Sequence, residues 1–266
     1  MLLSRRFITL TVLAAGLLAS CAQMPSPGDI EGRAKAWAES EIEQYGLARG
    51  SPREAKLRSL AVRTLSDESF IAASRTKPSH ESWNDWEARL TNEGANFIDG
   101  DVLLRFLRAK ARLFSEATDE ECVAGVQMAT NNESQSPILD AISKATNREV
   151  HPQVRAVWRQ RVARISEEDF DALSEVPMLA KLARAKRIGE PLPVFSPSEH
   201  ARVRHILESL MIGSASVSSQ KKMVDAAVSG DPLALCNVVR QLTTAQSRLS
   251  SADARIGLQV FGTGTK

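Results

Sequence analysis

Apolar residues recur along most of the chain at the three- and four-residue spacing of helices. Strand-like alternation of apolar and polar residues is scarce. The clearest stripes are Val203, Ile206, Leu207, Leu210 and Met211; Val154, Val157, Trp158, Val162 and Ile165; Leu103, Leu107, Ala111 and Phe114; and Leu235, Val239, Leu242 and Leu249. Each stripe gives a helix one buried face, so the pattern predicts an all-α fold.

Helix starts are marked by capping residues, several of them followed by proline. Ser51 and Ser196 each begin a capping box with proline at the first helical position, and Asp231 is also followed by proline. Ser136-Pro137 has the same form, and Thr118 and Ser166 precede acidic residues three positions later. The expected helices are 29–47, 52–65, 67–74, 99–116, 119–130, 137–147, 152–165, 167–187 (broken before Pro177), 197–212, 218–229 and 232–249. Because the intervals between caps follow no period, we expect an irregular multi-helix bundle and not a regular solenoid.

One interruption of the helical pattern suggests an internal boundary. Pro191 and Pro193 require an extended chain, which places a possible sub-boundary at 188–197. Val194 and Phe195 are apolar, so we interpret this stretch as a loop packed on the protein. The expected organisation is a spacer over 21–28, a single all-α domain over 29–250 and a mobile C-terminal tail over 251–266.

The N-terminal residues have the form of an export signal. A basic start from Met1 to Arg6 precedes the apolar run Phe7 to Leu18, which is followed by small residues. An apolar run of about a dozen residues is shorter than the roughly 20 that span a bilayer. Residues 1–20 are therefore expected to be a cleaved signal peptide.

Leu18-Ala19-Ser20-Cys21 resembles the lipobox of bacterial lipoproteins. The resemblance covers only residues 1–22, and it implies lipidation of Cys21, cleavage before it and acylation of the new amine. Several acyl chains on one residue give a stable membrane anchor. Ala22 follows the cysteine where an aspartate would imply retention at the inner membrane. The resemblance therefore implies attachment to the periplasmic face of the outer membrane.

Two further cysteines, Cys122 and Cys236, are on predicted apolar helix faces. With Cys21 lipidated in a compartment that permits disulfides, these two form the only possible pair. The alternative is two free buried thiols acting as small apolar side chains.

Charge and composition exclude some functions. Removal of Arg5 and Arg6 with the signal peptide leaves 32 basic against 32 acidic residues, and aromatic residues make up 5% of the chain. A neutral chain with few aromatics gives no reason to expect nucleic-acid binding. No motif predicts a metal site, a cofactor or a catalytic nucleophile. His200 and His205 are five residues apart, which on one helix turns them away from a shared metal.

The segment from Glu81 to Glu87 holds the most suggestive polar and aromatic residues. Trp83 and Trp86 fall on one face of a helical turn, where two indoles form a flat platform for a sugar ring. The alternative is that both indoles cover one end of the core. Glu81 and Asp85 are the candidate carboxylates for a cell-wall hydrolase, which needs a general acid of raised pKa.

Arg105, Arg108 and Arg112 form a stripe opposite the apolar face of their helix, and Arg155 and Arg159 form a shorter one. Guanidinium groups pair bidentately with carboxylates and phosphates, so the stripe is a candidate site for an acidic partner. The alternative is a solvated face paired with neighbouring acids.

Three hypotheses about function follow. The first is a non-enzymatic, lipid-anchored protein that binds a periplasmic protein, as an envelope adaptor or as an inhibitor of the immunity type. The second is a peptidoglycan hydrolase that uses a carboxylate. The third is a carrier of lipid or glycan ligands between its helices.

Overall fold

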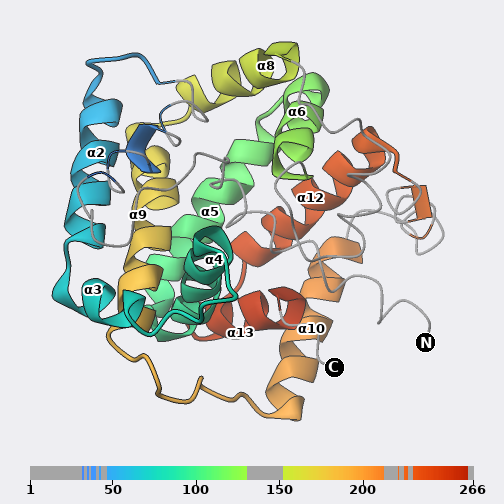
Figure 1. Cartoon of the computed structure of the whole chain (residues 1–266). Coiled ribbons are helices and arrows are strands. Elements are labelled where there is room, and N and C mark those ends of the chain that lie inside the picture. Colours follow the sequence, from blue (N-terminus) through green and yellow to red (C-terminus); the bar gives the residue numbers. More distant parts are fainter. Residues whose placement is uncertain are drawn as a thin grey trace.

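The computed structural model describes residues 47–130, 152–212 and 230–262, with single positions between 32 and 42 and between 221 and 226. Every element in these residues is a helix, which confirms the all-α prediction (Figure 1). The elements are α2 (Pro52–Leu65), α3 (Glu68–Ser74), α4 (Trp83–Gly94), the 3₁₀ helix η3 (Ala95–Phe97), α5 (Gly100–Ser115), α6 (Asp119–Thr130), α8 (Pro152–Ala163), α9 (Glu167–Ala185), α10 (Pro197–Ile212), α12 (Pro232–Ser247) and α13 (Ser251–Gly262).

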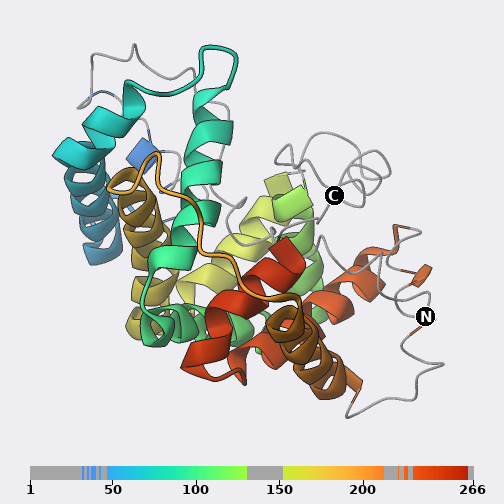
Figure 2. The same cartoon turned by 90° about the horizontal axis from the view of Figure 1, so that it is seen from below.

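Helix α5 lies at the centre of the bundle. It packs against α9 on one side and against α12 and α13 on the other, while α2, α3 and α4 cover α9 (Figures 1 and 2). The buried side of α5 includes Leu103, Leu107 and Phe114, three members of the stripe predicted from the sequence. These side chains belong to one apolar core that draws residues from every major helix.

The predicted caps hold the starts of their helices. The hydroxyl of Ser51 accepts from the backbone N–H of Glu54 at 3.2 Å, and the hydroxyl of Ser196 accepts from Glu199 at the same distance. Asp231 accepts from Leu233 at 2.9 Å. Each cap satisfies a backbone donor that has no partner within its helix, so local sequence fixes where these helices begin.

Two glycines let helices approach more closely than any larger residue would allow. A Cβ atom on Gly94 would lie 1.8 Å from the carbonyl oxygen of Ala180, and one on Gly100 would lie 2.1 Å from that of Ser251. Both distances are far inside van der Waals contact. Gly94 therefore sets the approach of α4 to α9, and Gly100 that of α5 to α13.

Cys122 of α6 and Cys236 of α12 form a disulfide with a Cα–Cα distance of 5.7 Å. Both side chains are fully buried. The predicted pairing is therefore confirmed, and the bond joins two helices that are 114 residues apart in the sequence.

The expectation of a mobile tail after residue 250 is wrong for residues 251–262, which form α13. The hydroxyl of Ser250 accepts from the backbone N–H of Asp253 at 3.2 Å, so the helix has a cap. Ala254 and Ile256 are buried in the core, and Arg255 donates to the carbonyl of Ile98 at 2.6 Å. Packing against α5 and α10 thus orders a segment whose apolar pattern is short.

The expected break before Pro177 is also wrong, because α9 runs unbroken from Glu167 to Ala185. A proline inside a helix removes one hydrogen bond, at a cost of about 3 kcal/mol. Pro177 is buried, and α9 packs against α2, α3, α4 and α5. These contacts compensate for the lost hydrogen bond.

Helix α4 was not among the helices predicted from spacing. It begins at a cap, since the hydroxyl of Ser82 accepts from the N–H of Asp85 at 3.1 Å. The predicted helices at 137–147 and 218–229 lie wholly or mostly outside the described residues, as do the signal peptide, Cys21 and the spacer. Among the helices that are described, none is long and apolar enough to cross a membrane.

Candidate interaction surface

The arginine stripe of α5 is on the exposed side of the helix, as predicted. Arg105, Arg108 and Arg112 are all exposed, but their surroundings differ. Across the described part of the chain, no carboxylate pairs with Arg105 or Arg108. Arg112 is occupied by a contact with another helix.

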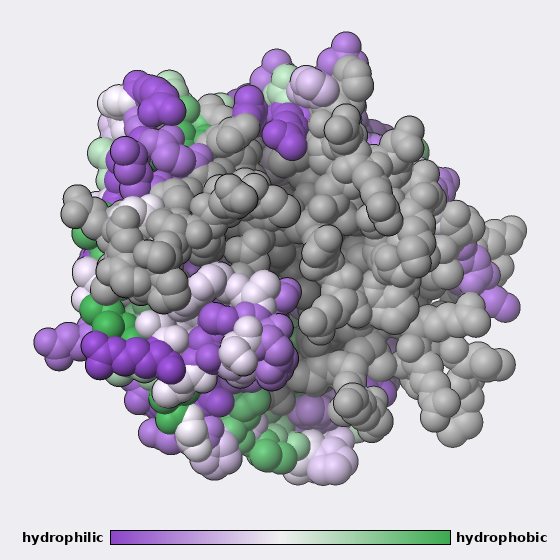
Figure 3. Space-filling view, viewed as in Figure 1, coloured by the Kyte–Doolittle hydropathy of each residue, from purple (hydrophilic) through white to green (hydrophobic). Residues whose placement is uncertain are grey.

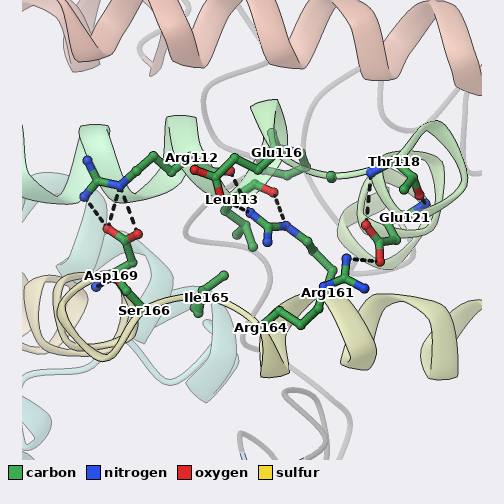
Figure 4. Close-up of polar contacts among 12 residues, drawn as sticks. Arg112, Leu113, Glu116, Thr118, Glu121, Arg161, Arg164, Ile165, Ser166 and Asp169 are labelled. Atoms are coloured by element: carbon green, nitrogen blue, oxygen red, sulfur yellow. Dashed lines mark hydrogen bonds and ion pairs between the residues drawn. The ribbon is translucent and has the colours of Figure 1, made fainter.

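Arg112 forms a bidentate ion pair with Asp169 at the start of α9 (Figure 4). Its Nε donates to the two carboxylate oxygens at 3.0 and 2.9 Å, and a terminal nitrogen donates to Oδ1 as well. Burial disfavours the charged form of Asp169, but hydrogen bonds from Arg112 and Ser166 outweigh it and lower the pKa of this carboxyl. Arg112 therefore joins α5 to α9 and is not available to a partner.

The end of α5 is held by a second arginine, which the sequence analysis did not single out. Arg161 of α8 is only 3% exposed. It donates to the backbone carbonyls of Leu113 and Arg112 at 3.0 and 2.8 Å, and to Oε2 of Glu116 at 3.1 Å (Figure 4). The carbonyl of Arg112 also accepts from the N–H of Glu116, at 3.1 Å. The last carbonyls of a helix lack the partners that those in its middle have, so Arg161 acts as a C-terminal cap from another helix.

The start of α6, which follows α5 in the chain, is held by a second arginine at the end of α8. Glu121 and Thr118 form the predicted capping box, in which Oε2 of Glu121 accepts from the N–H of Thr118 at 3.0 Å. Burial raises the pKa of Glu121, but this hydrogen bond and the ion pair with Arg164 leave it below its ordinary value. Two arginines at the end of α8 thus hold both the end of α5, the helix that carries Arg105 and Arg108, and the start of α6.

The shorter stripe is on α8, where Arg155 is exposed and Arg159 is half-buried. Figure 3 shows that hydrophilic residues dominate the described surface on one face of the molecule, with small apolar patches near its lower edge.

The proposed sugar platform of Trp83 and Trp86 is wrong. Trp86 is 1% exposed, and the two ring planes are perpendicular, with centroids 5.4 Å apart. Trp86 also contacts Phe70 edge to face, and Trp83 is half-buried with the ammonium of Lys77 at 5.3 Å from its ring. The pair covers an end of the core, which is the alternative stated above.

The two candidate carboxylates are engaged at the start of α4. Glu81 accepts from Nε and a terminal nitrogen of Arg89 at 2.9 and 2.8 Å, and these hydrogen bonds lower the pKa of Glu81. A general acid needs a raised pKa, so Glu81 has the opposite property. Asp85 is exposed and accepts from the Ser82 hydroxyl at 2.6 Å.

One buried titratable group was not among the candidate residues predicted from the sequence. Lys110 of α5 is 4% exposed, and burial lowers its pKa to about 8. It is on the same helical face as Leu103, Leu107 and Phe114, because seven residues make nearly two turns. Its position on an apolar helical face was the feature of the sequence that could have indicated its burial.

Other buried polar groups lie on the helices around α5. On α12, neither amide atom of the fully buried Gln246 has a hydrogen-bond partner among the described residues. Nε2 of His200 is also buried and unpartnered in the described structure.

Within the described residues, no group of three histidine, cysteine or acidic side chains is placed to hold a metal ion.

Comparison with known proteins identifies no relative. No family model, curated protein or solved structure matches the chain.

Proposed function

We propose that this protein is a lipid-anchored, non-enzymatic binding protein on the periplasmic face of the outer membrane, with an acidic protein as its partner. The anchor is Cys21, on the strength of the lipobox resemblance. The binding surface is the exposed side of α5 at Arg105 and Arg108. An envelope adaptor and an inhibitor of the immunity type both fit this description.

The observation that carries the proposal is the contrast between these arginines and their neighbours. Arg112 pairs with Asp169, and Arg161 pairs with Glu116, whereas no carboxylate pairs with Arg105 or Arg108 in the described structure. The two guanidinium groups are one turn apart on a helix fixed along its buried side. Exposed cations on one face of a helix favour encounter with a negatively charged surface and help to set its register.

The first experiment tests the anchor. Replacing Cys21 with Ser removes the thiol that carries the lipid, so acyl labelling of the protein is expected to disappear and the precursor to remain uncleaved. Unchanged labelling of the Cys21→Ser chain would reject the anchor.

The second experiment tests the surface in cell envelopes. Proteins cross-linked to the lipidated chain are compared for the parent, the pair Arg105→Glu/Arg108→Glu and the control pair Arg63→Glu/Arg75→Glu, which makes the same charge change at exposed arginines elsewhere. We expect a cross-linked partner that is lost only in the first pair and that weakens with added salt. Equal loss in both pairs would contradict a specific site on α5.

A further inference from the structure

A row of five charged residues runs along the exposed side of α5. Steps of three and four residues keep side chains on one face of a helix. All five residues are exposed, and in chain order they are Asp101, Arg105, Arg108, Arg112 and Glu116. The arginines therefore lie between two acids. At 1.5 Å of rise per residue, the row is about 22 Å long.

The acids at the two ends of the row keep their negative charge at the surface. The hydroxyl of Ser251 contacts the carboxylate of Asp101, and no cation among the described residues pairs with it. Glu116 accepts from Arg161 at 3.1 Å, but the side chain of Glu116 is 59% exposed. Both carboxylates can therefore act on a molecule that approaches the row.

A third carboxylate borders the row at the start of α9. Glu168 is exposed and has no cationic partner in the described part of the chain. It directly precedes Asp169, which pairs with Arg112 (Figure 4). Hydrogen bonding to Asp169 raises the pKa of Arg112, and burial opposes this effect. The charges of Glu168 and Glu116 raise it further, so both carboxylates lie near this end of the row.

No apolar side chain is part of this row. The highest exposure among the large apolar side chains described as exposed is 92%, at Val194 between α9 and α10. The sequence analysis expected Val194 to pack on the protein with Phe195. Only Phe195 packs against the core, so that expectation is wrong for Val194. A partner of the α5 row is therefore selected by the arrangement of charges.

We propose that the row binds a protein segment in which two acidic residues, one helical turn apart, are bordered by basic residues. The acidic pair lies against Arg105 and Arg108. The basic residues lie against three carboxylates, called the border here, which are Asp101, Glu116 and Glu168. This inference rests on the proposed function and refines it, because it states how charge is arranged on the acidic partner.

The border distinguishes this occupant from others. An extended polyanion, such as an anionic membrane surface, places negative charge against the border as well as against the arginines, and opposed like charges disfavour binding. A second copy meets the same difficulty. Two antiparallel rows centred on one another oppose Arg105 with Arg112. They also oppose Asp101 with Glu116. The occupant is therefore a different protein whose charges follow the opposite order.

Charge reversal of the border in cell envelopes tests the arrangement. Cross-linked partner is measured for the lipidated parent, for Asp101→Lys/Glu168→Lys and for the neutral pair Asp101→Asn/Glu168→Gln. The matched control is Glu68→Lys/Glu208→Lys, which changes two exposed acids elsewhere, one of them also in the first turn of its helix. We expect the border reversal to reduce cross-linking by about fivefold or more, the neutral pair to reduce it less, and the control to leave it unchanged. Equal yields for the border reversal and the control would overturn the proposal.

Binding to heparin, an extended polyanion, is a second test that needs no partner and no charge reversal. Full-length chains in non-ionic detergent are bound to immobilised heparin and eluted with salt. The neutral pair Asp101→Asn/Glu168→Gln should elute at higher salt than the parent. Glu68→Gln/Glu208→Gln makes the same change in net charge and should elute close to the parent. Equal shifts for the two pairs would show that the border does not repel polyanions and would overturn the proposal.

The Arg105→Glu/Arg108→Glu pair separates this proposal from the proposed function. If that pair keeps the cross-linked partner, the α5 surface is not the binding site and both are wrong. If that pair loses the partner while reversal of the border does not, the binding site stands and the arrangement of charges proposed for the partner is wrong.

Discussion

The guanidinium of Arg161 donates to the backbone carbonyl of Leu113 at 3.0 Å, so a side chain from α8 completes the end of α5. The same side chain reaches the carbonyl of Arg112, whose own guanidinium pairs with α9. The last turns of α5 are therefore joined to both α8 and α9. This arrangement makes the strongest prediction about stability.

Replacing Arg161 with Met should lower the free energy of unfolding by about 3 kcal/mol, because the carbonyl of Leu113 and the carboxylate of Glu116 lose their donor and the carbonyl of Arg112 keeps only the N–H of Glu116. The control is Arg105→Met, which should change stability by no more than about 0.5 kcal/mol since Arg105 is exposed. Urea denaturation measures both. Similar small effects for the two variants would contradict the role of Arg161.

The ion pair of Asp169 predicts a response to acid. The pKa of Asp169 is lowered in the folded protein, so the pair contributes stability above the unfolded value of about 3.9, and that stability is lost as pH falls through the folded value. Replacing Arg112 with Met should lower stability at pH 7 by about 1–3 kcal/mol and make its decline below about pH 4 shallower. Melting temperatures from pH 2 to 7 test this, and an unaltered decline would count against it.

Burial of the Lys110 charge, without an ion pair to any described residue, predicts a change of stability at alkaline pH. Its folded pKa of about 8 is below the unfolded value of about 10.4, so the unfolded chain binds more protons between these values and stability should rise with pH across that interval. Lys110→Met should be more stable at pH 7, by about 1–3 kcal/mol, and should lack this rise. Denaturation of both proteins at pH 7, 8, 9 and 10 provides the measurement. A less stable Met variant would show that Lys110 makes a favourable interaction.

The disulfide predicts a large effect of removing both cysteines. In the chain-entropy model a loop of this length contributes about 4–5 kcal/mol, which Cys122→Ala/Cys236→Ala should lose. Reduction should also slow migration of the denatured protein on a gel. Titration that finds two free thiols in the folded protein, purified without reductant, would show that the bond does not form.

Charge reversal separates the members of the arginine stripe. Arg105→Glu/Arg108→Glu should leave the melting curve nearly unchanged, since exposed charges contribute about 0–1 kcal/mol. Adding Arg112→Glu should lower the melting temperature clearly, because it places a carboxylate beside the buried Asp169. Differential scanning calorimetry of the double and triple variants makes the comparison. Identical curves would mean that the ion pair contributes nothing.

Much of the fold follows from local sequence. Ser51, Ser166 and Asp231 cap their helices as predicted, because a cap depends on residues within one turn. The two wrong predictions, a mobile tail after residue 250 and a break before Pro177, are explained by packing between residues that are distant in sequence. The pattern after residue 250 is short, yet α5 and α10 give α13 a surface to bury, and the contacts of α9 outweigh the effect of Pro177.

In the candidate site, too, features set by neighbouring residues were predicted and features set by residues distant in sequence were not. Arg105, Arg108 and Arg112 look equivalent in sequence, and only Asp169, 57 residues beyond Arg112, distinguishes the last of them. Trp83 and Trp86 share a helical face as predicted, but the position of Phe70 leaves Trp86 inside the core. Spacing along one helix predicts a shared face and gives no information about what covers it.

Burial of the disulfide has a consequence for biogenesis. Both sulfur atoms are enclosed by the packed core, out of contact with solvent. An oxidant can reach the two thiols only before the core has packed around α6 and α12, so the bond is expected to form once these helices meet and before that packing is complete. After closure the same packing shields the bond from reductants and from disulfide exchange. The order of events during folding, oxidation first and consolidation of the core second, therefore follows from the position of these two helices.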